Sequence, residues 1–369
     1  MKEGSRVVVA MSGGVDSSVA AVLLARQGFD VVGITIKTSN FEDVGGNEGN
    51  ESSCCSLDGI NDARKVAARF GFPHYVLDFT ARFSDEVIQP FIQEYMAGRT
   101  PNPCVLCNRT IKWEELLKKA DALGATHVAT GHYAHLQYSP EKRRFWISRG
   151  NDVQKDQSYA LWGLTQDSLS RTIFPLESLT KPEVRKLAGE FGLDAAKKGE
   201  SFEICFIPDN NYERFLKDQL PGLGEKVDQG EILMNGRKVG SHKGYPFYTI
   251  GQRRGVGIAT GEPVYVTGID PSENRLIVGP EEALYSRGLI ARDVNWMKYP
   301  VSPEGLAVDL RIRYKDRGGK ARLYPEDGGK VKVVFDEPRR AVSPGQSAVF
   351  YEGDDVVGGG IIQEVLKGR

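Results

Sequence analysis

The sequence predicts an α/β protein with an N-terminal parallel sheet, a small linking domain and a C-terminal antiparallel β-barrel. In the first half, apolar strand-like runs alternate with helix-like stretches, which is the pattern of a parallel sheet with crossover helices. Beyond about residue 209, short β-branched runs separated by Gly, Pro and Asn replace the long helical stretches. A chain of 369 residues has room for two or three domains. We expect them at residues 1–208, 209–282 and 283–369.

In the first half, the apolar runs and the helical spacing define the expected elements in turn. The strand-like segments are residues 6–11, 31–36, 73–79 and 127–130, and the helical segments are residues 17–27, 59–70 and 114–123. Two of these helices run into a glycine, Gly28 or Gly71, as helices often do at their C-termini. The acidic, glycine-rich segment 41–53 is expected to be a loop or a lid.

The second half consists mainly of expected strands, which favours two small β-rich domains. The short β-branched runs are residues 262–269, 274–278, 306–314, 330–335, 347–351 and 356–365. The last four fall within residues 283–369, where strands of this length separated by turns are typical of an antiparallel barrel.

Composition excludes several classes of protein. Hydrophobic residues make up 40% and charged residues 26%, as in a soluble globular protein rather than a collagen or a disordered chain. The apolar runs fall far short of the ~18 residues of a transmembrane helix, and the N-terminus lacks a signal-peptide pattern. We therefore expect a cytoplasmic protein without a membrane partner. The net charge of −1 means that any nucleic-acid surface must be a local basic patch.

The five cysteines do not read as a disulfide framework. Their number is odd, and the chain shows no sign of secretion. In a reducing compartment such cysteines are thiols, redox catalysts or ligands. They are Cys54, Cys55, Cys104, Cys107 and Cys205.

The strongest local motif is Ser-Gly-Gly-Val-Asp-Ser-Ser at residues 12–18, between a buried strand and a helix. A glycine turn that opens a helix exposes backbone N–H groups and the positive end of the helix dipole, which together favour an anion. The motif lacks the lysine of a Walker loop and the spacing of a dinucleotide fingerprint. It is instead the signature of the pyrophosphatase (PP) loop of ATP-dependent adenylating enzymes, which release AMP and pyrophosphate. The alternative is a simple glycine turn with a polar helix cap.

A second motif is Pro-Asn-Pro-Cys-Val-Leu-Cys at residues 101–107. Two cysteines separated by two residues indicate redox chemistry, metal binding or a thiolate nucleophile. The alternative is a pair of small buried side chains at the start of a helix. Because Cys205 provides a further thiol at residues 201–208, transfer of sulfur between cysteines is chemically reasonable.

Three further sets are weaker. Gly131 ends an expected strand, where the lack of a side chain would let a ligand approach. A histidine such as His132 is more often a packed or capping residue, and the alternative for the segment 155–157 is an ordinary solvated turn. A run of cations around Tyr314 suits phosphate contacts and base stacking, or a solvated strand face. This basic set is Arg311, Arg313, Tyr314, Lys315, Arg317, Lys320 and Arg322.

Taken together, these motifs resemble the tRNA-specific 2-thiouridylases, the MnmA family, over almost the whole chain. The ordered set is highly specific, although its single members are not. It comprises residues 12–18, 98–103, Cys107-Asn108, 130–133, 155–159, 204–207, 251–253, Arg313-Tyr314 and 344–351.

The resemblance implies a three-domain enzyme that converts uridine 34, the wobble base of certain tRNAs, to 2-thiouridine. ATP would activate the base through an adenylated intermediate, and a persulfide would supply the sulfur. The resemblance makes Cys107 the nucleophile and Cys205 the bearer of the persulfide. It places ATP at Ala10, Met11, Ser12, Gly13, Gly14, Val15, Asp16, Ser17, Ile36 and Gly131.

The resemblance also implies the surfaces that bind tRNA. Asn102, Pro103 and Cys104 would face the target base, and the anticodon stem-loop would be gripped by the linking domain and the barrel. The further tRNA-contacting positions are His132, Lys155, Asp156, Gln157, Arg313, Tyr314 and Gln346. Mg²⁺ is expected near Asp16, and a sulfur donor, such as a cysteine desulfurase or a sulfur-carrier protein, is expected as a partner of a monomeric enzyme.

One position departs from the family pattern. Family members with the best-known motif carry Asp where this chain has Cys104, and that Asp is proposed to assist proton transfer. Either another group does this work here, or Cys104, Cys107 and Cys205 bind an iron–sulfur cluster. We favour the persulfide route, because the Cys107 and Cys205 pair suffices for it. Two other classes share single features: an amidotransferase-like synthetase would share the loop, and a non-catalytic RNA-binding protein would share the basic set.

Overall fold

The computed structural model describes residues 4–38, 57–194, 204–259 and 261–367. Its N-terminal sheet consists of β1 (Arg6–Ala10), β2 (Asp30–Lys37), β3 (His74–Asp78), β4 (His127–Ala129) and β7 (Thr172–Ile173). The strands are parallel and lie in the order β3-β2-β1-β4-β7. The four predicted strands are confirmed, and β7 adds a fifth. The strand order reverses between β1 and β4, and ligands of such sheets bind in the crevice at the carboxyl ends beside this point.

Helices cover both faces of this sheet, because the strands alternate between two cores. Val7 and Val9 of β1 point to one core, with α1 (Val15–Arg26), α2 (Leu57–Phe70) and α8 (Lys181–Glu190). Val8 points to the other core, with Trp113 and α6 (Leu116–Ala122). The two predicted helices at 17–27 and 59–70 match α1 and α2, whereas the predicted loop at 41–53 lies outside the described residues.

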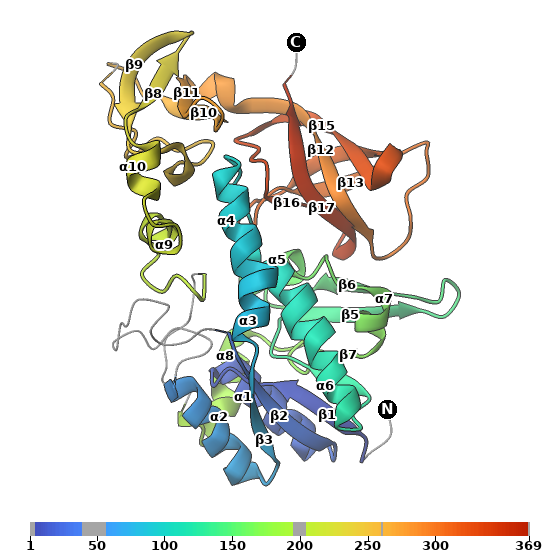
Figure 1. Ribbon diagram of the computed structural model, residues 1–369. Coiled ribbons are helices and arrows are strands. Elements are labelled where there is room, and N and C mark those ends of the chain that lie inside the picture. Colours follow the sequence, from blue (N-terminus) through green and yellow to red (C-terminus); the bar gives the residue numbers. More distant parts are fainter. Residues whose placement is uncertain (1–3, 39–56, 195–203, 260, 368–369) are drawn as a thin grey trace.

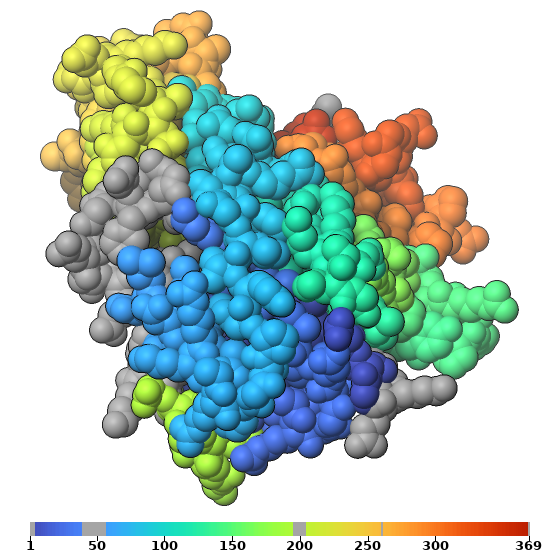
Figure 2. Space-filling model, turned by 60° about the horizontal axis from the view of Figure 1, so that its bottom comes forward, coloured from blue at the N-terminus to red at the C-terminus, as the bar shows by residue number. Residues whose placement is uncertain are grey.

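A long helical rod leaves the sheet after β3 and rises between the two other domains (Figure 1). It consists of α3 (Thr80–Phe83), a π-helical stretch at Ser84–Ile88 and α4 (Gln89–Met96). The chain then turns back through α5 (Pro103–Leu106) and a second π-helical stretch, Cys107–Glu115, into α6. In Figure 2 this rod (light blue) again separates the linking domain (yellow) from the barrel (orange and red).

The linking domain contains α9 (Tyr212–Gln219), α10 (Leu223–Val227) and a four-stranded sheet in the order β10-β11-β8-β9. Its strands are β8 (Gly230–Met234), β9 (Arg237–His242), β10 (Tyr265–Asp270) and β11 (Arg275–Gly279). A short 3₁₀ turn at Tyr245–Phe247 packs against α4 and α9.

The C-terminal domain is a closed antiparallel barrel, as predicted. Its strands are β12 (Tyr285–Trp296), β13 (Leu306–Arg311), β14 (Gly319–Glu326), β15 (Lys330–Arg340), β16 (Ser347–Glu352) and β17 (Asp355–Leu366). They follow the order β12-β15-β14-β13-β16-β17, and pairing of β12 with β17 closes the barrel. Leu289, Leu310 and Phe350 are among the residues that fill it.

One sheet crosses the boundary between the first and last domains. The hairpin β5 (Ala134–Ser139) and β6 (Arg144–Arg149) follows β4, and β6 pairs with β17 through Ser148 and Asp355. Ser148 Oγ also donates to the Asp355 carboxylate at 2.5 Å. The remaining short elements are α7 (Gln166–Ser170) and the 3₁₀ turns Ser158–Ala160, Glu281–Leu284 and Asp327–Gly329. Among the described residues, no helix is long and apolar enough to cross a membrane.

Candidate active site

The phosphate-loop motif lies where the fold predicts a ligand, between the end of β1 and the start of α1. Gly13 adopts φ +77°, and Gly14 precedes α1 in an extended conformation. The Ser12 N–H donates to Ser17 Oγ at 3.1 Å, and Ser17 Oγ donates to the Gly14 carbonyl at 3.2 Å. These bonds fold the loop over the first turn of α1, at the carboxyl end of β1, where ligands of such sheets bind.

Gly13 is also the point where α2 meets the loop. A Cβ at this position would lie 2.1 Å from the Gly59 carbonyl oxygen, in the first turns of α2. The left-handed backbone and the close approach of Gly59 therefore both require glycine.

Gly13→Ala should destabilise the protein by more than the ~1–2 kcal/mol of a left-handed alanine, because α2 must also move. It should abolish ATP binding, since the loop cannot keep its shape. Gly71→Ala is the matched control, because Gly71 has φ +74° and open space around it. Urea unfolding and ATP titration of both variants check this prediction. Equal losses of stability would contradict the close-packing argument.

The Asp16 carboxylate, in the first turn of α1, is held by two residues from distant segments. Tyr133 donates its hydroxyl to Oδ1 at 2.7 Å. The Lys181 ammonium contacts Oδ1 at 2.8 Å and Oδ2 at 2.7 Å. The sequence analysis missed both partners. One feature could have pointed to Lys181: it is a lysine in the first turn of a helix, where the helix dipole disfavours a cation unless an acid pairs with it.

Gly131 lies beside the phosphate loop, where the absence of a side chain makes room for the backbone of α1. A Cβ here would lie 2.7 Å from the carbonyl carbon of Asp16 and 2.7 Å from the Ser17 nitrogen. Gly131 therefore admits the backbone of α1 beside the loop. Met11 is buried, and its carbonyl accepts the Thr35 hydroxyl at 2.7 Å, which joins the loop to β2.

Cys107 and Cys205, far apart in sequence, pack against one apolar cluster, which we call the cysteine cluster. Its members include Cys107, Phe91, Ile111 and Phe206, and Cys205 packs against it from its edge. Cys107 is buried and Cys205 is partly exposed. Phe206 lies 5.2 Å from Phe91 between ring centroids. Ile36 and Leu77, near the carboxyl ends of β2 and β3, pack against the same cluster, which therefore reaches the sheet edge that carries the phosphate loop.

Local structure fixes the two cysteines of the Cys-x-x-Cys motif in different surroundings. The Asn102 side chain caps α5 by accepting the Cys104 N–H at 3.2 Å, and Pro103 occupies the first turn. Cys107 then begins a π-helical stretch, a feature that often marks functional sites. Cys104 is exposed, and its charge is one of the smaller contributions that raise the pKa of Tyr314, after burial and Asp156.

The iron–sulfur alternative does not fit this arrangement. A cluster needs three thiolates that converge on it, whereas Cys104 is exposed and Cys107 is buried in the cysteine cluster. Within the described ranges, no three His, Cys, Asp or Glu residues are grouped so that they could hold a metal ion. For Mg²⁺, both Asp16 oxygens already bind Lys181.

The segment 155–157 joins domains instead of presenting all its side chains to RNA. Asp156 is buried, where its carboxylate accepts from the Ser158 N–H and hydroxyl at 3.0 Å and from Arg311 at 3.4 Å. Its carbonyl accepts the Tyr314 hydroxyl at 3.2 Å. Gln157 Oε1 accepts the Tyr133 N–H at 3.0 Å. A carboxylate buried in this network cannot reach RNA. The structure therefore does not support direct contact between Asp156 and tRNA.

The remaining predicted tRNA contacts differ in accessibility. Arg313 and Tyr314 are exposed in the turn between β13 and β14, and Lys155 is half-buried. His132 packs against the rings of Trp113 and Phe174, and burial holds its pKa well below the usual 6.5, so the ring is neutral at pH 7. His132 therefore cannot serve as a cationic phosphate contact.

Gln346 reaches from the barrel to the segment before Cys104. Its amide nitrogen donates to the Thr100 carbonyl at 2.9 Å and to the Pro101 carbonyl at 3.3 Å, and the Thr100 N–H donates to Pro344 at 2.8 Å. The linking domain holds the other side, where Tyr245 donates its hydroxyl to the Met96 carbonyl at 2.8 Å. The barrel therefore fixes the chain directly before Asn102, and the linking domain fixes the end of α4.

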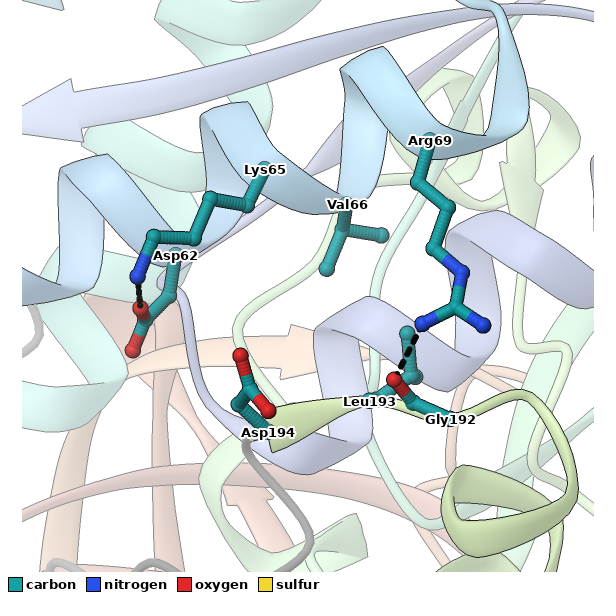
Figure 3. A pocket seen from close by; sticks show the side chains of 7 residues that line it. All are labelled: Asp62, Lys65, Val66, Arg69, Gly192, Leu193 and Asp194. Atoms are coloured by element: carbon teal, nitrogen blue, oxygen red, sulfur yellow. Dashed lines mark hydrogen bonds and ion pairs between the residues drawn. The ribbon is translucent and has the colours of Figure 1, made fainter.

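A pocket on the outside of the N-terminal domain contains none of the predicted site residues (Figure 3). It lies between α2 and the chain after α8, and its lining residues are Asp62, Lys65, Val66, Arg69, Gly192, Leu193 and Asp194. Lys65 pairs with Asp62 at 3.4 Å, and Arg69 donates to the Gly192 carbonyl. Because cations and carboxylates balance here, we assign no ligand to this pocket.

The fold and the loop define the class: a parallel-sheet HUP domain with a PP-loop, followed by a linking domain and a barrel. Family models match in the same order: the tRNA methyl transferase HUP domain at residues 5–209, the tRNA methyl transferase PRC-barrel domain at 213–280 and the aminomethyltransferase beta-barrel domain at 286–362. The chain belongs to the family of tRNA-specific 2-thiouridylases, MnmA.

Full-length relatives support this assignment. The MnmA of Salinibacter ruber is 54% identical, over 99% of this chain and 96% of the relative. That of Cytophaga hutchinsonii is 51% identical over 100% of both chains. Among solved structures, a 4-thiouridine synthetase–RNA complex with bound ATP has a TM-score of 0.39 and 19% identity, covering 59% of this chain and 51% of that chain. This structural similarity is too low to bear on function.

Proposed function

We propose that this protein is an ATP-dependent tRNA-uridine 2-sulfurtransferase that forms 2-thiouridine at position 34. The observation that carries the proposal is that Cys107 belongs to, and Cys205 packs against, one apolar cluster, which extends to the sheet edge that bears the phosphate loop. An amidotransferase-like synthetase has no need of this cysteine pair, and a non-catalytic RNA-binding protein has no need of the loop. The family names, all tRNA-specific 2-thiouridylase, agree with the proposal.

The first step activates a poor electrophile. The C2 oxygen of the flipped uracil attacks the α-phosphorus of ATP, and pyrophosphate leaves, so that C2 carries an AMP ester. The loop at residues 12–17 supports this step by offering backbone N–H groups to the phosphates. Mg²⁺ would arrive with the ATP phosphates, as it commonly does.

The second step transfers sulfur. The terminal sulfur of a Cys205 persulfide attacks C2, and the Cys107 thiolate then attacks the Cys205 sulfur. The persulfide S–S bond breaks, its electron pair remains with the sulfur on C2, and AMP leaves as the C=S bond forms. A disulfide between Cys107 and Cys205 remains, and a dithiol reductant must supply two electrons to reset it. A donor of persulfide sulfur, such as a cysteine desulfurase or a sulfur-carrier protein, must then reload Cys205.

The segment 102–104 would face the base: the barrel holds the chain just before it through Gln346 and Thr100, and the linking domain holds the end of α4 through Tyr245 and Met96. In this role Asp156 and Gln346 are positioning residues: Asp156 fixes Tyr314, and Gln346 fixes the chain before Asn102. Pyrophosphate release with and without tRNA tests the function. Release that depends on tRNA supports the proposal, and release without tRNA favours a different adenylating enzyme.

Arg313→Ala should weaken tRNA binding roughly three- to tenfold and lower the slope of log K against log salt by about 1, because it removes one exposed phosphate contact. ATP affinity should not change. Lys65→Ala is the matched control, since it removes the same charge from α2, away from the barrel. Filter binding across a salt series checks this prediction. An unchanged slope would show that Arg313 does not contact phosphate.

A further inference from the structure

The Asp16 carboxylate creates an electrostatic difficulty in the phosphate loop. It lies in the first turn of α1, the part of the loop that would receive the ATP phosphates. Its side chain is 31% exposed, so its charge is only partly screened by water. An uncompensated negative charge here would repel a triphosphate. The loop motif itself contains no cation, unlike a Walker loop.

Lys181 meets this carboxylate from a different part of the chain. Its ammonium lies 2.7–2.8 Å from both Asp16 oxygens, and its side chain is only 10% exposed. Lys181 also occupies the first turn of α8, where the helix dipole disfavours a cation. An acid at the phosphate loop and a buried lysine at a helix N-terminus are each unfavourable alone. Here the two opposite charges neutralise each other.

The surrounding contacts fix Lys181 at this position. The Lys181 N–H donates to Asp152 Oδ2 at 2.9 Å, and a capping box between Thr180 and Glu183 defines the helix start. On the other side, Tyr133 holds Asp16 Oδ1 at 2.7 Å. The carboxylate is thus clamped between two elements and cannot turn freely toward a ligand.

We propose that Lys181 is a positioning residue of the nucleotide site, which acts through Asp16 by cancelling its charge and holding it, so that the loop accepts the phosphates of ATP. The inference rests on the ATP site of the proposed function. It concerns nucleotide binding alone, so it can fail or stand independently of tRNA thiolation.

The test is the binding of ATP and adenosine to the full-length protein, measured by calorimetry in EDTA so that no metal can replace the lysine. Lys181→Met should weaken ATP binding roughly 10- to 100-fold, because one unit charge near the phosphates is left unpaired. Adenosine affinity should stay within about twofold, because adenosine carries no phosphate. Lys186→Met is the matched control, since Lys186 lies on the same helix and its side chain is 79% exposed.

A double variant tests whether Lys181 acts by cancelling the charge of Asp16. Removing both charges with Asp16→Asn and Lys181→Met should restore most of the ATP affinity lost in the single Lys181 variant. Lys181→Arg should keep ATP affinity within a few fold, and it keeps the test valid if Lys181→Met fails to fold. Equal losses for ATP and adenosine, no loss for either, or no rescue by Asp16→Asn would each overturn the inference.

Discussion

Cys205→Ser should abolish tRNA thiolation, with a loss on the order of a thousandfold or more, because no side chain remains to carry the sulfur. ATP-dependent pyrophosphate release should persist, since the phosphate loop is untouched. Cys205 is partly exposed at the edge of the cysteine cluster, which makes it the accessible member of the pair for a sulfur donor. Labelling of the protein by a ³⁵S-persulfide donor, followed by tRNA analysis, measures both steps.

Cys107→Ser provides the contrast within the same experiment. Cys205 should still accept labelled sulfur in this variant, but turnover should nearly cease, because nothing remains to break the persulfide bond on C2. The Ser variants of Cys54 and Cys55, which lie outside the described residues, should retain activity and serve as controls. Thiolation by Cys205→Ser, or failure of Cys107→Ser to accept sulfur, would contradict the assigned roles.

Asp16→Ala should lower AMP and pyrophosphate formation at least about 100-fold, because the first turn of α1 loses its links to Tyr133 and Lys181 beside the phosphates. The change also leaves the Lys181 ammonium without the carboxylate that it contacts at 2.7 Å. Binding of tRNA should be nearly unchanged, since the barrel and the linking domain lie elsewhere. Pyrophosphate release and tRNA binding of the same preparation check both halves of the prediction.

Asp30→Ala is the matched control for this loss. Asp30 is the first residue of β2, so it lies at the amino ends of the strands, away from the phosphate loop. It pairs with Arg6 at 2.7 Å. An exposed pair of this kind contributes about 0–1 kcal/mol, so activity should remain. Undiminished pyrophosphate release by Asp16→Ala would show that the phosphate loop takes no part in the reaction.

The sequence was informative wherever a local pattern decides the structure. The buried run of β1, the glycine turn and α1 are all encoded within residues 6–27, and their structure follows from strand burial and helix capping. Alternating short strands likewise predicted the barrel.

Contacts between distant segments decided what the sequence could not predict. Nothing local pairs Lys181 with Asp16, because 165 positions separate them and the contact exists only once α8 packs beside α1. Asp156 looked like a solvated turn residue, yet the barrel buries it against Arg311. The β5–β6 hairpin joins the barrel through its pairing with β17 and through Arg144, which donates to the Trp296 and Met297 carbonyls, so its role also depended on the assembled domains.

The most direct test of the central claim is mass spectrometry of the nucleosides of tRNA treated with the purified protein, ATP and a persulfide donor. We expect 2-thiouridine at position 34, formed only when ATP is present and with one AMP released for each sulfur incorporated. Sulfur at C4 or at another position, or ATP cleavage that leaves the tRNA without sulfur, would contradict it.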